Sequence, residues 1–492
     1  MQNSTDQTRQ GLRYSIIEGV FAHTFANLIG TIFLPAFALL LGAGSFEIGL
    51  LAAIPFLATL AQFSGAALVE RIGNPKLVAI SFAFAARFLW LPIVVLIYYL
   101  HETDPALLLI IFMIFFVLYH TLGSMSGVAW LSWMASLVPE EIRGRFFGLR
   151  NSVLGLVTII ITLVGGRFLD WYRSSFSDAS PIGAFEIIFS LALVCGLISV
   201  AFLMRKPAVA LMRQPAIHPR GRFHEIWGHI NFRKMLRFAL FWSFSVNFAS
   251  PFFIVYMLQD LHLSYTYIGL MAVLSAIADL VGMGFWGHFS DQHGNRPVVI
   301  LCAAGAAISP ALWYFTMGNG FYVPALIAVL HIAGGFFFAG YNLCSVNLVF
   351  RMVPRGSNAL FFAMWSAVNG LTAAGGALAG GWFSQNAVSL FSGLSLKSVF
   401  IPVFLLSAVM RILSFTLLRR IEEETSTPAV RVVRILRSLR VWASTMGYHP
   451  LVQFFLPSAP SDKKTPESGN VWPLWKIDAF LERSRLWRWM RP

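Results

Sequence analysis

Charged side chains are scarce in this chain of 492 residues. Asp, Glu, Lys and Arg make up only 12% of it, hydrophobic residues make up 57%, and the mean hydropathy is +0.70. So much apolar surface cannot be hidden in a core that is surrounded by water. The composition excludes a water-soluble protein and indicates an all-α polytopic membrane protein.

Cysteine is also rare, and the sequence patterns of catalytic and metal sites are missing. The three cysteines, Cys195, Cys302 and Cys344, all lie in apolar runs, which argues against a disulfide framework and fits packing between helices. There is no metal-ligand spacing, nucleotide-binding loop or Ser-His-Asp arrangement. We therefore expect no enzyme, no cofactor and no metal site.

Long apolar runs are abundant. A run of about 20 residues crosses a bilayer as an α-helix, and here polar turns separate runs of roughly that length or more. The runs lie at residues 15–41, 46–68, 77–100, 105–135, 146–169, 183–204, 235–258, 265–287, 298–318, 322–350, 358–384 and 399–418. The sequence thus predicts twelve transmembrane helices.

The two halves of the chain repeat each other. IGLLAAI, from Ile48 to Ile54, returns 220 residues later as IGLMAVL, and Gly165-Gly166 returns 215 residues later as Gly380-Gly381. An ordered series of matches at a nearly constant offset indicates two pseudo-symmetric six-helix bundles. Close helix packing is the simplest reason for the paired glycines. The expected divisions are a cytoplasmic N-terminal segment at 1–14, bundles at 15–204 and 235–418, a cytoplasmic central linker at 205–234, and a cytoplasmic amphipathic tail at 419–492.

Lysine and arginine collect on one side of the predicted helices. The N-terminal segment, the central linker and the turns after the even-numbered helices carry them, whereas only Arg167, Arg173 and Lys397 fall on the other side. Cytoplasmic loops are enriched in basic residues, so we expect both termini in the cytoplasm. The net charge of +14 is then explained by the cytoplasmic location of the basic residues and their contact with membrane lipids. We therefore expect no nucleic-acid partner.

Two short turns between predicted helices share a motif. In AALVERIGNPK (residues 66–76) and GHFSDQHGNRP (residues 287–297), an acid stands three residues before a Gly-Asn pair, and a basic residue follows. Gly-Asn tolerates positive φ angles, so the chain can reverse sharply at both places.

Two six-helix halves with this turn resemble the major facilitator superfamily, across about residues 13–420. The family signature of the turn is Gly, three residues, Asp-Arg, one residue, Gly, one residue, basic. The second half departs only at Gln292, which replaces the arginine; in the first half Ala66 replaces the glycine and the lysine falls one place late. The resemblance implies that the matching residues gate the inner side of a transporter. They are Glu70, Arg71, Gly73 and Lys76 in the first turn, and Gly287, Asp291, Gly294 and Arg296 in the second.

A further stretch, from Trp133 to Asn151, resembles a poorly characterised bacterial branch of the superfamily. That resemblance implies a bacterial inner membrane protein and a general transport activity. The glycine-proline signature of many antiporters is missing before Gly165, where Ile161 and Thr162 stand, which weakens a drug-antiporter interpretation.

Ionisable side chains inside the predicted helices need a reason, because each costs about 2.5–3.5 kcal/mol at a helix centre. Asp279 has no counterpart in the first half and, with His23, is the candidate for proton coupling. Glu18 lies one turn inside the first helix and can reach the interface. We expect Arg87 to form a structural ion pair or to snorkel, and Arg411 to snorkel.

A polar stripe recurs in the first helix of each half, at helical spacing on one face. In this superfamily those two helices flank the central cavity, so the stripe is the predicted substrate site; hydrogen bonding between helices is the alternative. The stripe consists of His23 and Asn27 in the first half, and Ser243, Asn247 and Ser250 in the second.

We therefore expect a monomeric secondary active transporter of a small organic solute that works by alternating access, with H+ as the coupling ion and export preferred over uptake. One alternative is an uptake permease for a neutral polar solute such as a sugar. An alternative of another class is a non-transporting membrane scaffold or pigment-delivery protein, suggested by the long tail.

Overall fold

The computed structural model describes residues 2–101, 103–176, 178, 180–208, 227–318, 320–353, 358–390 and 397–423, with the backbone alone at residues 2–8 and 358–360. Within these ranges the chain is helical and contains no strand. Most of the predicted central linker and tail lies outside them. Eleven spans of the described chain are long and apolar enough to cross a membrane, and each overlaps a predicted run.

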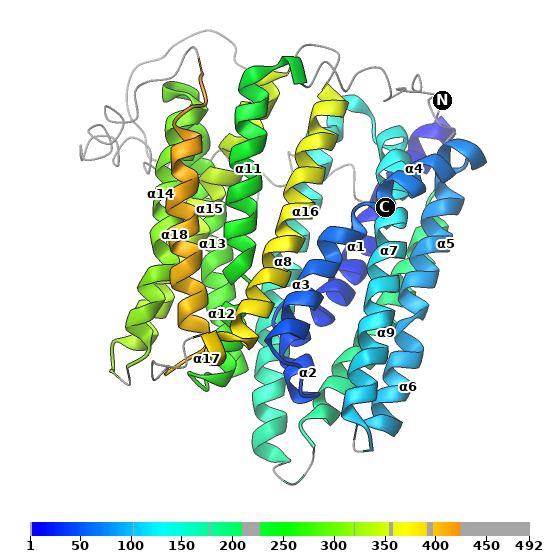
Figure 1. The fold of residues 1–492 in the computed structure, drawn as a ribbon. Helices are drawn as coiled ribbons and strands as arrows, with labels where there is room; N and C mark the ends of the chain where they lie inside the picture. The colour runs from blue at the N-terminus through cyan, green and yellow to red at the C-terminus, as the bar shows by residue number, and fades with distance from the viewer. Residues whose placement is uncertain are drawn as a thin grey trace, which may run out of the picture.

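The first half contributes six spans, several of them broken once near the middle (Figure 1). Its helices are α1 (Gln2–Leu28), α2 (Phe33–Leu40), α3 (Ser45–Ala58), α4 (Ala61–Ile72), α5 (Pro75–Phe88), α6 (Trp90–Leu100), α7 (Pro105–Leu137), α8 (Glu140–Ser175) and α9 (Ile182–Arg205).

The second half contributes the other five spans and one further long helix. Its helices are α11 (Ile230–Ala249), α12 (Phe252–Gln259), α13 (Tyr265–His293), α14 (Asn295–Leu312) with a 3-10 turn at Trp313–Thr316, α15 (Val323–Met352), α16 (Asn358–Gln385), α17 (Ala387–Leu390) and α18 (Phe400–Leu418). Although α16 is not among the eleven spans, it occupies the predicted run at 358–384 and packs between α11 and α3.

The backbone confirms the predicted repeat. The first span of each half is interrupted at equivalent places, around Thr31, where φ is +43°, and at Ser250 before Pro251. The turns that follow these spans also match, with positive φ at Gly42 and at His262. Each half folds as a bundle of its own, because α1 to α9 pack mainly against one another and α11 to α18 do the same.

The two motif turns have the predicted shape. Gly73 ends α4 with φ of +72°, and Gly294 ends α13 with φ of +90°, a conformation that glycine adopts without steric cost. Asn74 then caps α5, since its Oδ1 accepts a hydrogen bond of 3.0 Å from the backbone N–H of Leu77.

The bundles share their large apolar cluster at one end of the molecule, and a small cluster of Ala53, Ala374 and Ala377 joins them where α3 meets α16. At the end that carries α2, α12 and α17, which we call the α2 end, one cluster of buried side chains draws on both halves. At the opposite end, where the N-terminus lies (Figure 1), the large clusters each belong to a single bundle. The bundles are therefore packed together at the α2 end and separate toward the N-terminal end.

Candidate functional site

The contact between the bundles near the α2 end, which we call the seam, has two equivalent parts. In the first, α3 meets α16, and Ser384 Oγ donates a hydrogen bond of 3.0 Å to Ser45 Oγ. A Cβ added at Gly49 would lie 2.5 Å from the carbonyl oxygen of Ala377, and one added at Gly381 would lie 2.7 Å from that of Ser45. Only glycine permits this approach of the two backbones.

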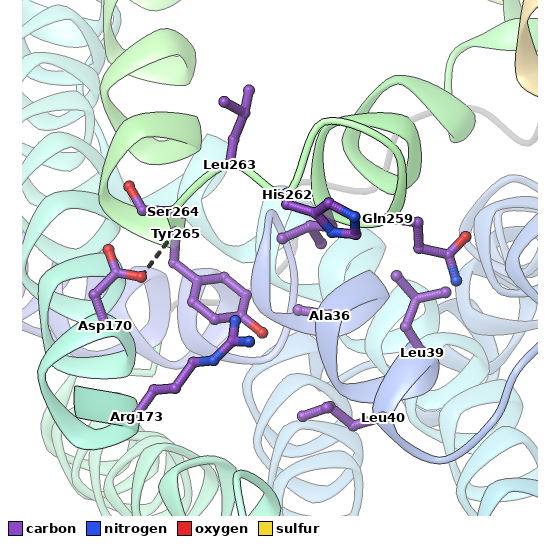
Figure 2. A pocket seen from close by; sticks show the side chains of 11 residues that line it. Ala36, Leu39, Leu40, Asp170, Arg173, Gln259, His262, Leu263, Ser264 and Tyr265 are labelled. Carbon is purple, nitrogen blue, oxygen red and sulfur yellow. Dashed lines mark hydrogen bonds between the residues drawn. The ribbon is translucent and has the colours of Figure 1, made fainter. Parts of the chain in front are cut away.

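In the second part of the seam, α8 meets α13. A Cβ at Gly166 would lie 2.9 Å from the carbonyl oxygen of Tyr265. The Asp170 side chain accepts a hydrogen bond of 3.0 Å from the backbone N–H of Tyr265 (Figure 2). It accepts a second, of 2.7 Å, from that of Thr266, and these are the first two residues of α13. N–H groups in the first turn of a helix have no partner within the helix and carry partial positive charge. A carboxylate of one bundle thus caps a helix of the other.

Repeat-related glycines occupy the seam. Gly49 and Gly269 are equivalent, as are Gly166 and Gly381, and all four contact the other bundle; Gly269 faces the carbonyl oxygen of Thr162. The neighbouring Gly165 packs against Phe33 of its own bundle. Close packing was the expected reason for the glycine pairs, and the structure shows that the second member of each pair packs between bundles.

A pocket of about 480 Å³ lies beside the seam at the α2 end (Figure 2). Asp170 and Arg173 of α8 and Tyr265 of α13 form one wall, and Leu39 and Leu40 of α2 lie across from them. The pocket therefore lies at the junction of the two bundles.

A second pocket, of about 250 Å³, lies within the first bundle among α1, α5, α7, α8 and α9. We call it the charged pocket, and the side chains and glycines that matter here are Glu18, Phe25, Arg87, Tyr119, Gly123, Gly127, Trp130 and Arg150. Glu18 Oε2 lies 3.0 Å from Lys206 Nζ and 3.8 Å from Arg150 Nη2. Glu18 is only 4% exposed, so it does not reach the interface. Burial lowers the pKa of Lys206, and Glu18 opposes that shift.

Two arginines depart from expectation. Arg87 points into the charged pocket; it donates to the Ala83 carbonyl oxygen at 3.1 Å, and no described carboxylate lies within 4 Å of it. Arg411 is 2% exposed and does not snorkel, because Nη1 donates to Ala306 O at 2.8 Å and Nη2 to Val246 O at 3.3 Å. The latter bonds tie α18 to α14 and α11.

The predicted substrate stripe is placed on α1 and α11. Asn27 Nδ2 donates to Thr158 Oγ1 of α8 at 3.3 Å, and Ser243 Oγ donates to Asn369 O of α16 at 3.0 Å. Asn247 Nδ2 bonds to Ser243 O within α11, and Ser250 is exposed at the end of that helix. His23 is half-buried. The bonds to α8 and α16 are of the kind that the alternative interpretation expects, so the substrate role stays a prediction.

The predicted coupling acid, Asp279, is half-buried on α13. It forms no hydrogen bond or ion pair with any part of the chain that the structure describes. Its proposed partner His23 lies on α1, in the other bundle.

The predicted gating residues line the N-terminal end. Glu70, Arg71 and Asp291 are exposed. Lys76 Nζ donates to Lys206 O at 2.6 Å, and its repeat partner Arg296 donates through Nη2 to Arg419 O at 3.1 Å, so both bind within their own bundles.

An acid that the sequence analysis missed caps α14 in the second half. Glu423 accepts from the N–H groups of Asn295 (3.2 Å) and Arg296 (2.7 Å) and pairs with Arg351 at 2.9 Å. Asp170, Arg150 and Lys206 were also missed. Arg150 lies inside a predicted helix, and a charged residue at such a position could have been singled out from the sequence. The neighbouring residues of Asp170 and Glu423, in contrast, do not indicate which groups these two acids bind.

Comparisons with known proteins agree with this architecture. The profile of the Major Facilitator Superfamily matches residues 236–461. A curated relative, autophagy-related protein 22-1 of Phaeosphaeria nodorum, is 24% identical over 210 residues, which are 40% of this chain and 35% of that protein. The match therefore spans about a third of the relative.

Solved structures share the fold at low identity. The nucleoside transporter NupG has a TM-score of 0.62 at 14% identity, over 85% of this chain and 100% of that one. A bacterial homolog of the human lysosomal transporter Spinster, inward-facing and unoccupied, has 0.58 at 12%, over 87% and 100%. The D-xylose-proton symporter has 0.58 at 16%, over 85% and 97%. The chain is therefore similar to the Major Facilitator Superfamily over residues 236–461, just under half of its length, and it shares the fold of solved membrane transporters.

Proposed function

We propose that the protein is a secondary active transporter that moves a small organic solute by alternating access, and that the structure represents its inward-facing state. The observation that carries the proposal is the unequal packing of the bundles: one apolar cluster joins them at the α2 end, and separate clusters fill them at the N-terminal end. With both termini in the cytoplasm, the α2 end is the outer end.

The seam has the properties of a gate that opens and closes. Its contacts run between preformed helices; glycines, two serines and one carboxylate make the close backbone and polar contacts, beside the apolar cluster that both bundles share. Such contacts separate without unfolding either bundle, because each bundle keeps its own core near the N-terminal end.

The inner gate is open in this arrangement. Lys76 and Arg296 bond to carbonyl oxygens of their own bundles, and Asp291 is exposed. In the outward-facing state we propose that the two motif turns meet the opposite bundle, as the family resemblance implies.

Coupling to protons is the proposed energy source, with Asp279 and His23 as the titrating groups and export as the preferred direction. Asp279 supports this role because it is an acid within a membrane span that forms no ion pair among the described residues. We also propose that the protein lies in the bacterial inner membrane and is a monomer.

Cysteine accessibility tests the proposed state. In a variant without Cys195, Cys302 and Cys344, which are all buried, Ala26→Cys places a thiol at the charged pocket. A membrane-impermeant maleimide should label it from the cytoplasmic side and not from the outer side in oriented vesicles. Labelling from neither side, or equally from both, would contradict an inward-facing transporter and would favour a non-transporting scaffold.

A further inference from the structure

Buried positive charge exceeds negative charge at the charged pocket. Glu18 is the only acid within ion-pair distance of the cations there, among the described residues, whereas Arg87, Arg150 and Lys206 all carry positive charge. A buried charge without a partner is costly in a membrane protein. An anion that enters the pocket would remove that cost.

The three cationic side chains differ in how many of their N–H groups already have a hydrogen-bond or ion-pair partner. The side chain of Lys206 is fully buried and lies 3.0 Å from Glu18. Arg150 approaches Glu18 only to 3.8 Å and donates through Nε to the carbonyl oxygen of Ser15 at 3.4 Å. Arg87 uses one N–H group on the carbonyl oxygen of Ala83, while its buried Nε has no described partner. A guanidinium offers five N–H donors and binds carboxylates and phosphates in a bidentate manner. Arg87 and Arg150 therefore have donors to spare.

We propose that the charged pocket binds the anionic group of a small organic acid, with Arg87 and Arg150 as its ligands and aromatic side chains around its apolar body. This inference rests on the proposed transport function and names the substrate class.

Apolar and aromatic walls accompany the charges. Phe25, Tyr119 and Trp130 line the pocket; the Arg150 guanidinium lies 4.7 Å from the Trp130 ring centre, and that of Arg87 lies 5.8 Å from the Phe25 ring centre. Rings in this position orient the guanidinium groups and offer faces to an apolar solute.

Glycines keep the pocket free. On α7, a Cβ added at Gly123 or at Gly127 would meet no atom within 4 Å. The volume of about 250 Å³ lies just below the roughly 300–1,000 Å³ of pockets that hold drug-sized ligands, which suits a molecule with a single ring.

Benzoate is a suitable probe, and benzamide is its neutral counterpart of the same shape. In a neutral detergent, millimolar benzoate should raise the Tm of the protein, and benzamide should not, because ligands of the folded state stabilise it. The affinity for radiolabelled benzoate should fall at least about tenfold in Arg87→Gln and in Arg150→Gln, since each loses a charged hydrogen bond. Arg145→Gln, which removes an exposed arginine from the same helix α8, is the matched control and should bind as the wild type does.

Gly127→Val narrows the pocket without removing a charge, and it serves if an arginine variant does not fold. It should weaken binding of benzoate. Equal stabilisation by benzamide, or benzoate binding that survives Arg87→Gln and Gly127→Val, would overturn the proposal.

Anionic lipid headgroups carry the same kind of charged group as an organic acid. A separate binding experiment therefore distinguishes a bound lipid from a bound solute. In nanodiscs of phosphatidylcholine, and of phosphatidylcholine with phosphatidylglycerol, benzoate should bind equally well. Loss of binding only in the phosphatidylglycerol discs would show that a lipid occupies the pocket and would overturn the solute assignment. Benzoate binding is measured without transport, so its failure is distinguishable from failure of the accessibility test.

Discussion

The carboxylate of Asp170 in the first bundle accepts a hydrogen bond of 2.7 Å from the backbone N–H of Thr266 in the second. Together with the bond to Tyr265, this contact places a full negative charge on the N-terminus of α13. In the proposed alternating-access cycle, this polar contact of the seam must break when the α2 end opens. On that proposal, the balance between the two states depends on it.

Replacing Asp170 with Asn should shift the protein toward the outward-facing state. The variant keeps one acceptor oxygen but loses the charge, and a hydrogen bond to a charged group contributes about 1.5–3 kcal/mol. Labelling of Ala26→Cys from the outer side should rise about tenfold for each 1.4 kcal/mol lost. Asp178→Asn, an exposed acid at the same end, is the control and should leave labelling unchanged.

The seam glycines should tolerate no added methyl group. In Gly49→Ala the new Cβ meets the carbonyl oxygen of Ala377, so the seam must widen, and overpacking costs about 1–3 kcal/mol. Outer-side labelling should increase in Gly49→Ala and in Gly381→Ala. Gly155→Ala on α8, where a Cβ meets nothing within 4 Å, should label as the wild type does and keep or raise the Tm.

Glu18→Gln should destabilise the fold, because it leaves Lys206 and Arg150 without their carboxylate; breaking a buried pair costs about 3–5 kcal/mol. Burial already holds the pKa of Lys206 below its usual 10.5, and loss of Glu18 lowers it further. The charged ammonium is costly below that folded-state pKa, and the cost disappears as the pH rises through it toward 10.5.

The Tm deficit of Glu18→Gln should therefore shrink as the pH rises from neutral toward 10.5. The double variant Glu18→Gln with Lys206→Met removes both charges and should recover part of the lost stability at neutral pH. A deficit that is independent of pH and unchanged by Lys206→Met would show that the ion pair is not its cause.

Asp291→Asn tests the proposed inner gate. Because Asp291 is exposed, the variant should keep its Tm; if the structure is the proposed inward-facing state, labelling of Ala26→Cys from the cytoplasmic side should increase. Glu423→Gln should instead lower the Tm, since Glu423 caps α14 and pairs with Arg351. Unchanged accessibility in Asp291→Asn would remove its gating role.

Asp279→Asn tests proton coupling. A neutral side chain cannot carry a proton through the cycle, so transport driven by a pH gradient should cease while exchange of solute across the membrane continues.

Asn27→Ala and Asn247→Ala should weaken solute binding with little change in Tm. Misfolding of these two variants with normal kinetics in the folded remainder would assign the polar stripe to helix packing.

Local sequence patterns determined the helices, the repeat and the turns. Apolar runs set the spans because a bilayer admits only backbone that satisfies its own hydrogen bonds, and Gly73 and Gly294 fixed the turns because their φ angles are positive. The repeated glycines marked two surfaces of close approach. They did not show that Gly166 and Gly381 face the other bundle while Gly165 and Gly380 face their own, since neighbours on a helix point about 100° apart and only the packing assigns a partner to each.

Tertiary structure decided which charges meet. Asp170 and Thr266 are 96 residues apart in the chain, and Glu18 and Lys206 are 188 apart. No periodicity within a helix relates such residues, because their contact depends on how separate helices pack. For the same reason Arg87, expected to pair or snorkel, turned out to face the charged pocket, and Glu423, which the sequence did not mark, caps α14. The sequence determined the spans and the symmetry of this protein, whereas the contacts at each end of the bundles and the positions of its buried charges follow only from the packing of the two bundles.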